Sequence, residues 1–442
     1  MIGPDDTTAT AKVATLATKP DAAATEKAAK RAAQITEYEA NNDPSLSKLE
    51  RYRRNANVPM TVYMSLVHIG ALFGLWAGLF KCTWATLAFS FVLYFLSALG
   101  ITAGVHRLWS HRSYKAALPY RIFMMLLNSL ANQGTIYHWA RDHRVHHLKC
   151  ETDADPHNAE RGFFFSHVGW LLVKKDPRVI HAGQDLDLRD LDALPEVRFQ
   201  RKLDPVWNLF WCFAFPALVA RYLWGEPLLQ GFLVAGVFRY VYCLHITWLV
   251  NSAAHAWGFR PYEKTDHHGA WPSENAFVSL TAIGEGWHNW HHAYPYDYAA
   301  SELGVSQQFN PTKLVIDAAA CLGLVTGRKR ALRAWDARKT RLGKASPPAA
   351  HNHADGHDHH HDGGFATLEE LIAEREGEQR NHAAAAKRHR AVARPVQPHR
   401  VHESTFGVPL FRYRRIVTSK GDSREGWAPD HRPARRIARM GC

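Results

Sequence analysis

The sequence lacks the features of a secreted, disulfide-bonded or nucleic-acid-binding protein. Its six cysteines are scattered and form no Cys-x-x-Cys pair, as in chains whose thiols stay reduced. The first 45 residues hold no apolar run of the signal-peptide kind, so we expect no cleaved leader. The formal net charge is +13, but no helix-turn-helix, zinc-finger or RNP-like pattern accompanies it. We therefore expect no nucleic-acid partner, and an anionic membrane surface or a phosphorylated ligand can explain the basic balance.

Long hydrophobic runs are present, and they gather between about residues 58 and 325. Four of them reach the roughly 20 residues that a helix needs to cross a bilayer. They cover Val58–Phe80, Trp84 to about Gly104, about Val206–Trp224 and about Leu228–Ser252. Three residues link the first run to the second, and three link the third to the fourth. The pattern therefore predicts two helical hairpins of membrane-spanning helices.

Basic residues lie at one end of these runs and are nearly missing from the hairpin tips. They include Arg53 and Arg54 before the first run, Arg107 and Arg112 after the second, and residues 328–330 after the fourth. By the positive-inside rule, both termini face the cytosol, together with segments 105–205 and 253–330. Because an even number of crossings separates the two segments, we expect them to pack together as a helical cap.

Composition divides the chain into three regions. Residues 46–330 are expected to form an all-α integral membrane domain, with four transmembrane helices in two hairpins and the cytosolic cap. Residues 1–45 and the His-, Ala- and Arg-rich residues 331–442 are poor in apolar side chains, which predicts mostly disordered segments. The tail repeats a His-x-x-His-His spacing at His357, His360 and His361, but nothing there would orient the imidazoles.

Three histidine clusters lie within the membrane domain, at the expected cytosolic edge. They are His106-x4-His111, His143-x-x-His146-His147 and His288-x-x-His291-His292. On an α-helix, positions i, i+3 and i+4 share one face, so each of the last two clusters can direct three imidazoles at a metal. Positions i and i+5 lie about 140° apart, so the first cluster needs a larger site, two metals or a bend.

The number of imidazoles favours two metals. Eight are too many for one tetrahedral zinc, and suit a pair of metals with open positions for oxygen and substrate. Imidazole is compatible with iron, zinc, copper and nickel, so the spacing leaves the metal open. Soluble di-iron bundles have two Glu-x-x-His pairs, whereas this region shows one, at Glu285 and His288. His255, with Asn251 one turn before it, adds an intramembrane polar pair and a ninth candidate imidazole.

Long phrases surround these histidines. They are GITAGVHRLWSHRSYKA (100–116), WARDHRVHH (139–147), ETDADPHNAERGFFFSHVGWLLVKK (151–175), WLVNSAAHAWGFRPY (248–262) and GEGWHNWHHAYPYDY (284–298). Over roughly residues 46–330, the chain resembles the membrane acyl-CoA desaturases of the stearoyl-CoA Δ9 type. The resemblance implies a di-iron centre with two Fe²⁺ ions. The residues that match the family's ligands are His106, His111, His143, His146, His147, His255, His288, His291 and His292, with Asn251 holding a metal through water.

The resemblance also implies a kinked substrate tunnel. Gln133, Trp139 and Thr247 match residues that shape the kink, and Tyr94 matches the residue that closes the far end. The coenzyme A region is matched by Arg141, Asp142, Lys174 and Lys175, with Trp170 and Trp248 nearby. The chain departs from the family at Gly134, His138, Trp287 and Trp290 and over residues 263–272 (EKTDHHGAWP), and none of these departures removes a ligand.

The implied activity is that of an oxygen-dependent oxidoreductase, a stearoyl-CoA 9-desaturase, in the endoplasmic reticulum membrane. It would insert a cis double bond into a saturated fatty acyl-CoA, using dioxygen and electrons. The His-Pro-Gly-Gly haem motif of relatives with a fused cytochrome b5 is missing. We therefore expect electrons from a separate cytochrome b5, served by NADH-cytochrome b5 reductase.

Two other functions stay open from the sequence. A membrane di-iron hydroxylase acting on fatty acyl chains or alkanes uses similar boxes but inserts oxygen. A His-rich membrane protein that binds or transports metal would depend on the tail and not on the boxes. The sequence does not determine acyl chain length, oligomeric state, the role of the tail or how the histidines divide between two metals.

Overall fold

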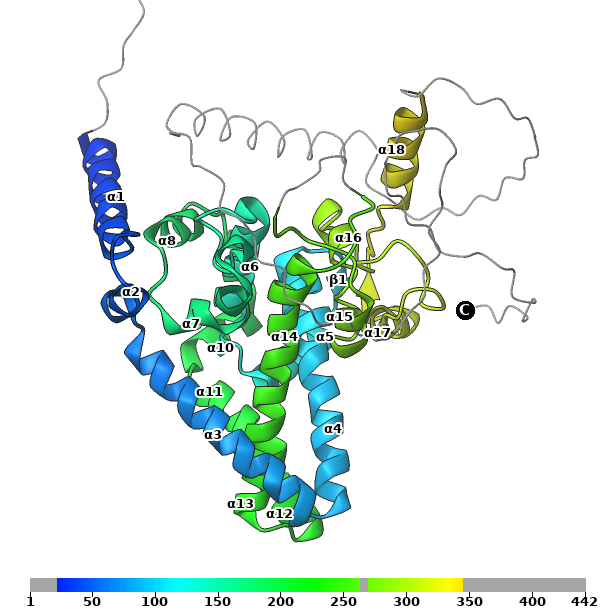
Figure 1. Ribbon diagram of the computed structural model, residues 1–442. Coiled ribbons are helices and arrows are strands. Elements are labelled where there is room, and N and C mark those ends of the chain that lie inside the picture. The colour runs from blue at the N-terminus through cyan, green and yellow to red at the C-terminus, as the bar shows by residue number, and fades with distance from the viewer. Residues whose placement is uncertain (1–21, 263–268, 345–442) are drawn as a thin grey trace, which may run out of the picture. The chain divides into compact units, whose positions relative to one another are not determined.

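The computed structural model describes residues 22–262 and 269–344, all within one compact unit (Figure 1). The tail motif at His357, His360 and His361 lies outside the described residues.

Four helical segments are long and apolar enough to cross a membrane, which confirms the expected two hairpins. The first is α3 (Val58–Phe80), and the second joins α4 (Trp84–Leu99) to the π-helix η1 (Gly100–Ser110). The third comprises α11 (Val206–Leu209), η4 (Phe210–Ala214) and α12 (Phe215–Trp224), and the fourth α13 (Leu228–Gly231), η5 (Phe232–Phe238) and α14 (Arg239–Ala256).

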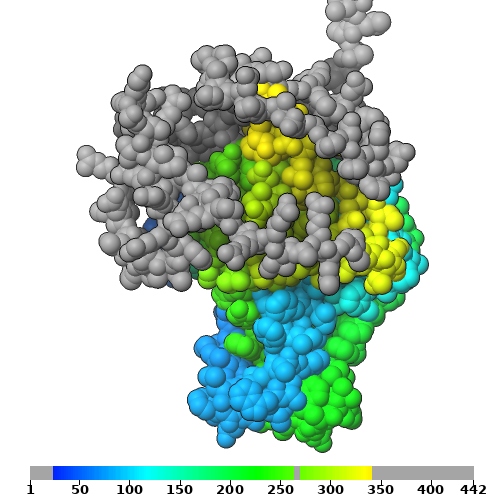
Figure 2. Space-filling model, turned by 90° about the vertical axis from the view of Figure 1, so that its right-hand side faces the viewer, coloured from blue at the N-terminus to red at the C-terminus, as the bar shows by residue number. Residues whose placement is uncertain are grey.

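The two hairpin tips are tied together by the buried carboxylate of Glu226. The hydroxyls of Thr83 and Thr86 donate to Glu226 Oε2 over 2.7 and 2.5 Å, and the Thr83 amide adds a third bond. Thr83 also caps α4, because its hydroxyl accepts from the Thr86 amide. Trp224 donates to the Thr86 hydroxyl from the other hairpin, and Figure 2 shows α4 (light blue) beside α12 and α13 (green).

Arg239 shows how the bundle accommodates a cation inside a span. Its side chain is 1% exposed, and it donates to the carbonyls of Ala235, Leu130 and Cys212 and to the Ser97 hydroxyl. Burial with hydrogen bonds to carbonyls and a hydroxyl lets a span carry a cation. Many apolar side chains of α3, in contrast, are exposed, as a lipid-facing helix requires.

Short helices build the cap, on the same end of the bundle as η1 (Figure 1). Segments 105–205 and 253–330 do pack together there, as expected, because histidines from both lie in contact. The first segment contains α5 (Leu118–Ala131), α6 (Ile136–Lys149), η2 (Ala159–Arg161), η3 (Phe165–Gly169), α7 (Trp170–Leu172), α8 (Pro177–Gln184), α9 (Arg189–Asp192) and α10 (Pro195–Leu203). The second contains α15 (Ala276–Thr281), α16 (His288–Ala293) and α17 (Pro311–Cys321). Two-residue strands β1 (Lys115–Ala116) and β2 (Val325–Thr326) pair antiparallel, so the architecture is essentially all-α.

Helices also occupy parts of both segments that were expected to be mostly disordered. They are α1 (Ala22–Asn41) near the beginning and α18 (Leu332–Lys344) after the last span, whereas α2 (Lys48–Asn55) lies within the expected membrane domain. The sequence of α1 is rich in Ala, Glu and Lys, which are strong helix formers. Ion pairs join α1 to α8 and the residue after it, between Glu39 and Arg178 and, over 2.8 Å, between Arg31 and Asp185. The domain boundaries at 45/46 and 330/331 stay predictions.

Candidate metal centre

The first histidine cluster lies on a π-helix. A π-helical turn closes a hydrogen bond between residues five apart, here from the His111 amide to the His106 carbonyl over 3.2 Å. Residues five apart are therefore much closer in angle than the roughly 140° that separates them on an α-helix. This local winding brings His106 and His111 to one site, and among the three possibilities left by the spacing it corresponds to a bend in the helix.

The other two clusters lie on α6 and on the short helix α16, and a ninth histidine, His255, ends α14. Their ligand atoms, with those of His106 and His111, gather in two groups, each with all atoms within 4.8 Å of one another. The first group consists of His106, His111, His143, His147 and His291, and the second of His146, His255, His288 and His292.

Each His-x-x-His-His cluster is divided between the two groups. On α6, His143 and His147 enter the first group and His146 enters the second. On α16 the assignment is reversed, because His288 and His292 enter the second group and His291 enters the first. Each helix therefore lies between the two groups, sending positions i and i+4 to one and position i+3 to the other. The sequence allowed three imidazoles of one helix to share a metal, and the structure does not adopt that arrangement.

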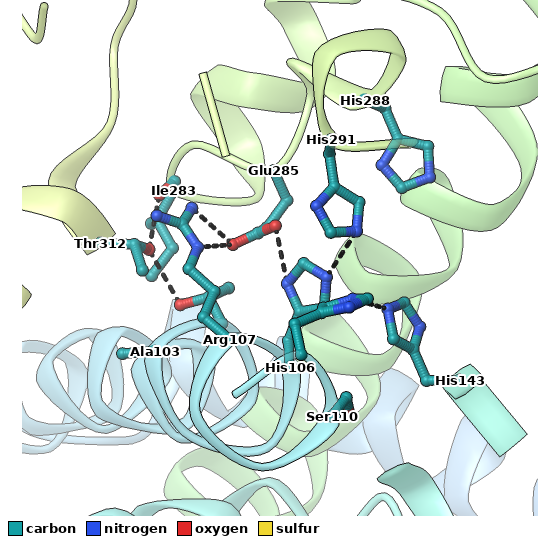
Figure 3. Close-up of polar contacts among 12 residues, drawn as sticks. Ala103, His106, Arg107, Ser110, His143, Ile283, Glu285, His288, His291 and Thr312 are labelled. Atoms are coloured by element: carbon teal, nitrogen blue, oxygen red, sulfur yellow. Dashed lines mark hydrogen bonds and ion pairs between the residues drawn. The ribbon is translucent and has the colours of Figure 1, made fainter. Parts of the chain in front are cut away.

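The Nε2 atoms of these histidines face one another at close range. The Nε2 atoms of His106 and His291 lie 3.0 Å apart, as Figure 3 shows, and those of His147 and His291 lie 2.9 Å apart. In the second group, the His288 Nε2 lies 3.0 Å from that of His255 and 3.2 Å from that of His292.

Carboxylates fix the opposite ring nitrogens. His106 Nδ1 lies 3.0 Å from Glu285, His146 Nδ1 2.9 Å from Asp155, and His255 Nδ1 2.5 Å from Glu151. A carboxylate accepts from Nδ1–H, so the neutral ring keeps its lone pair on Nε2. Two Nε2 atoms that both carry lone pairs repel one another at about 3 Å, and a cation bound by both removes that repulsion. The donor set thus fits a metal in each group.

Electrostatics keep most of the other imidazoles neutral. Burial, and then neighbouring imidazoles, hold the pKa values of His143, His147 and His291 well below the ordinary value. Neutral imidazole is the form that binds a metal. Burial alone would raise the pKa of Glu285, but Arg107 and His106 lower it to about 2, so this carboxylate stays ionised.

Arg107 is a functional side chain that the histidine spacing did not reveal. It is fully buried and donates to Glu285 over 2.7 Å (Figure 3). It also donates to the carbonyls of Tyr298 and Ala299. It therefore holds Glu285 against His106. Glu151, Asp155 and Glu285 were visible in the sequence, within ETDAD and GEGWH, but only their positions behind the histidines show what they do.

Among the predicted tunnel residues, Trp139 lies beside the first group. Trp139 stacks on His143 with ring centroids 4.8 Å apart, and the Gln133 amide donates to the Thr247 hydroxyl over 2.8 Å. Tyr94 donates to the Thr281 carbonyl and lines an apolar cavity of about 350 Å³ between α3, α4 and η5. Asn251 lies one turn before His255 on α14, and its role at a metal stays a prediction.

The predicted coenzyme A residues are farther along α6 and beyond it. Asp142 forms ion pairs with Arg141 and Lys175. Lys174 and Lys175 line a cavity of about 460 Å³ against α1.

Trp170 packs on His157, and Trp248 lies among His68, His167 and His245. Gly134, where the family has an asparagine, has a φ of +89°, a conformation that glycine adopts without strain.

Comparison with known proteins agrees with this site. The fatty acid desaturase family model matches residues 82–303, which include all nine histidines. Human stearoyl-CoA desaturase 5 is 49% identical over 71% of this chain and 93% of its own length. Human stearoyl-CoA desaturase is 50% identical over 67% of this chain and 79% of its own, and mouse acyl-CoA desaturase 3 is 52% identical over 65% and 77%. The chain therefore belongs to the fatty acid desaturase family, and is an oxidoreductase of the stearoyl-CoA desaturase type.

Proposed function

We propose that this chain is an acyl-CoA Δ9 desaturase that converts a saturated fatty acyl-CoA into its cis-unsaturated product. The observation that carries the proposal is the pair of histidine groups, with Trp139 stacked on His143 at their edge. Two Fe²⁺ ions are the proposed metals, one in each group. With dioxygen, they supply the oxidising power for an unactivated carbon chain that no side chain has.

The net reaction sets what the chain must provide. Removing two hydrogens from adjacent carbons while reducing dioxygen to two waters consumes two electrons and two protons. We propose that the electrons come from a separate cytochrome b5 with NADH-cytochrome b5 reductase, at the cytosolic face of the endoplasmic reticulum. The chain's own residues fix which carbons lie beside the metals, because reactivity at an unactivated chain depends on position.

Two contacts would set that position. Trp139 forms a wall next to His143, and the hydrogen bond from Gln133 to Thr247 joins the residues before α6 to α14. This bond crosses between the cap and a membrane span, which is where a tunnel must bend to pass the metals. Tyr94 would end the tunnel deeper between the spans.

The basic cavity beside α1 is the proposed site of the coenzyme A phosphates. Lys27 and Lys30 of α1 line it opposite Lys174 and Lys175. Ammonium groups on two sides of a cavity provide charge-assisted hydrogen bonds to phosphate. The short ion pair with Asp142 orients Lys175.

Product analysis tests the proposal. The full chain, loaded with iron and supplied with NADH, reductase, cytochrome b5 and stearoyl-CoA, is expected to yield the cis-9 unsaturated acyl-CoA. A panel of saturated acyl-CoA lengths then defines the preferred chain. A hydroxylated product without alkene would overturn the proposal in favour of a di-iron hydroxylase.

A further inference from the structure

Trp290 departs from the family and lies within the cluster His288-x-x-His291-His292, which we call the third histidine box. Its surroundings are therefore informative. It sits on α16 between His288 and His291, which belong to different groups, and its side chain is fully buried. Its backbone amide donates to Glu274 over 2.7 Å. Its ring contacts other aromatic rings behind the box, on the side away from the metals.

These rings form a cluster that reaches beyond the membrane domain. The rear cluster consists of Tyr262, Trp290, Tyr294 and Trp335, and Trp335 lies on α18. The Trp290 centroid lies 4.7 Å from that of Tyr294 and 4.9 Å from that of Tyr262. The Trp335 centroid lies 5.2 Å from Tyr262 and 6.3 Å from Trp290, both close to perpendicular. These are the separations and angles at which aromatic pairs attract one another.

Two carboxylates bind the rear cluster to α18 and to the residues just before it. Glu302 accepts from the Trp335 indole with one oxygen and from the Tyr262 hydroxyl with the other, each over 2.7 Å. Asp297 accepts from the Trp290 indole over 3.3 Å and from the Ala331 amide over 3.0 Å. The contact thus fixes both the position and the direction of α18. Figure 1 shows α18 at the same end of the unit as α16.

The helix that carries the third box cannot hold its own shape. α16 has six residues, whereas isolated helices shorter than about 12 residues are marginal in water. Its orientation must therefore come from contacts with its neighbours. Trp290 is its largest fully buried side chain, so what packs on Trp290 affects where His288, His291 and His292 point.

We infer that α18 is a positioning element of the third histidine box, acting through Trp335 on Trp290. α18 packs on the face of α16 that carries Trp290. This contact keeps His291 directed at one histidine group and His288 and His292 at the other. The helix lies outside residues 82–303, which the family model matches. The inference rests on the proposed metal binding, but not on which product the enzyme makes.

Three variants of the full chain test this role, together with a control. Trp335→Ala removes the ring, Trp335→Phe keeps an aromatic surface without the indole N–H, and Glu302→Gln removes one of two acceptors. The control is Trp207→Ala, because Trp207 also packs edge-to-face on an aromatic ring, Trp211, and donates its indole N–H to a buried hydroxyl, that of Ser129, over 3.0 Å. Each protein is loaded anaerobically with Fe²⁺. Iron per chain, the rate of iron loss to a chelator and the melting temperature are then measured.

The expected pattern separates positioning from general stability. Trp335→Ala should lose iron about 10–100 times faster, the range found when support behind metal ligands is removed. Glu302→Gln should show a smaller acceleration, and Trp335→Phe should restore most of the wild-type retention. Trp207→Ala should lower the melting temperature while iron loss stays at the wild-type rate.

Other results would overturn the inference. One is a wild-type rate of iron loss in Trp335→Ala, and another is an equal acceleration in Trp335→Ala and Trp207→Ala. If Trp335→Ala does not fold, a wild-type rate in Glu302→Gln is the contrary result. Because iron retention is measured without turnover, a hydroxylated product would reject the proposed reaction and leave this result standing.

Discussion

Two assemblies of histidines lie in the described part of this protein, and they use the same side chain in different ways. In the metal centre, nine histidines gather in two groups with their Nε2 atoms directed inward. Where the spans meet the cap, His68 of α3, His245 of α14 and His167 of η3 are joined end to end in what we call the histidine row. The Nε2 atoms of His68 and His245 lie 3.2 Å apart, and His245 Nδ1 lies 3.0 Å from His167 Nε2.

The partners of the remaining ring nitrogens explain the difference. Carboxylates hold His106, His146 and His255 in the metal centre. The histidine row of His68, His245 and His167 instead ends on uncharged groups at both sides. His68 donates to the Met64 carbonyl over 2.6 Å, and His167 lies 2.9 Å from the Ser252 hydroxyl. His245 uses its two nitrogens for two different neighbours, so these three rings do not direct their nitrogens at one point.

The comparison teaches that a metal centre differs from a hydrogen-bonded row of histidines because several ring nitrogens converge on one place, four in one group and five in the other. The rings of His68, His167 and His245 surround Trp248, so we expect this histidine row to stabilise the packing around that side chain.

Replacing one histidine from each assembly gives the largest expected contrast. His291→Ala removes a ligand from the first group, so we expect desaturation to fall by at least about 1,000-fold, with loss of bound iron. His245→Ala removes hydrogen bonds and some packing, and we expect less than about a 10-fold decrease. Product formation and iron content check both. Equal losses in the two variants would show that the two assemblies are not functionally distinct.

The carboxylates behind the histidines provide the next contrast. Glu285→Gln replaces the ionised partner of His106 and Arg107, so iron affinity should fall about 10–100-fold. Glu226→Gln is the matched control, because Glu226 is also buried but joins only the hairpin tips. It should lower the melting temperature without changing iron affinity. Competition with a calibrated chelator measures both, and an unaltered affinity in Glu285→Gln would contradict the role of the carboxylate.

Tyr94 tests whether the membrane region sets chain length while the metal centre performs the chemistry. Tyr94→Ala removes the ring beside the cavity of about 350 Å³, so we expect longer saturated acyl-CoA chains to be accepted. Tyr94→Phe keeps the ring and should keep the wild-type preference. Competition between acyl-CoA lengths measures the change. An identical profile in Tyr94→Ala would count against this tunnel end.

The smallest expected effect concerns Glu274, a buried carboxyl behind the centre that differs from Glu285. Burial raises the pKa of Glu274 from 4.5 to about 8, so it is protonated at neutral pH. The folded state then binds the proton more tightly than the unfolded state, and wild-type stability should decline as pH rises from about 4.5 through 8. Glu274→Gln should match wild type near pH 4, where the carboxyl is protonated in both the folded and the unfolded state, and should become the more stable protein as pH rises to about 8. Melting temperatures across this range check the sign, and parallel curves would show that Glu274 is ionised throughout.

The spans and the histidine inventory could be predicted from the sequence because each depends on local information. Runs such as Val58–Phe80 have the length and apolarity of a membrane span whatever surrounds them. The histidine boxes stood out by spacing and by the long phrases around them. The short links at residues 81–83 and 225–227 likewise determined which spans form hairpins.

The division of the histidines was decided only by the tertiary structure. His143 and His146 are three residues apart, but they serve different groups because α6 runs between the two sets of partners. His106 and His111 share a group because η1 winds as a π-helix. No pattern of residues in the sequence predicted this π-helix. The packing of Trp335 on Trp290 joins residues 45 positions apart in sequence, and it explains a tryptophan that the spacing of the third box had left without a role. Local periodicity fixes which side chains share a face, but the partners of that face come from distant parts of the chain, and these partners determine what the face does.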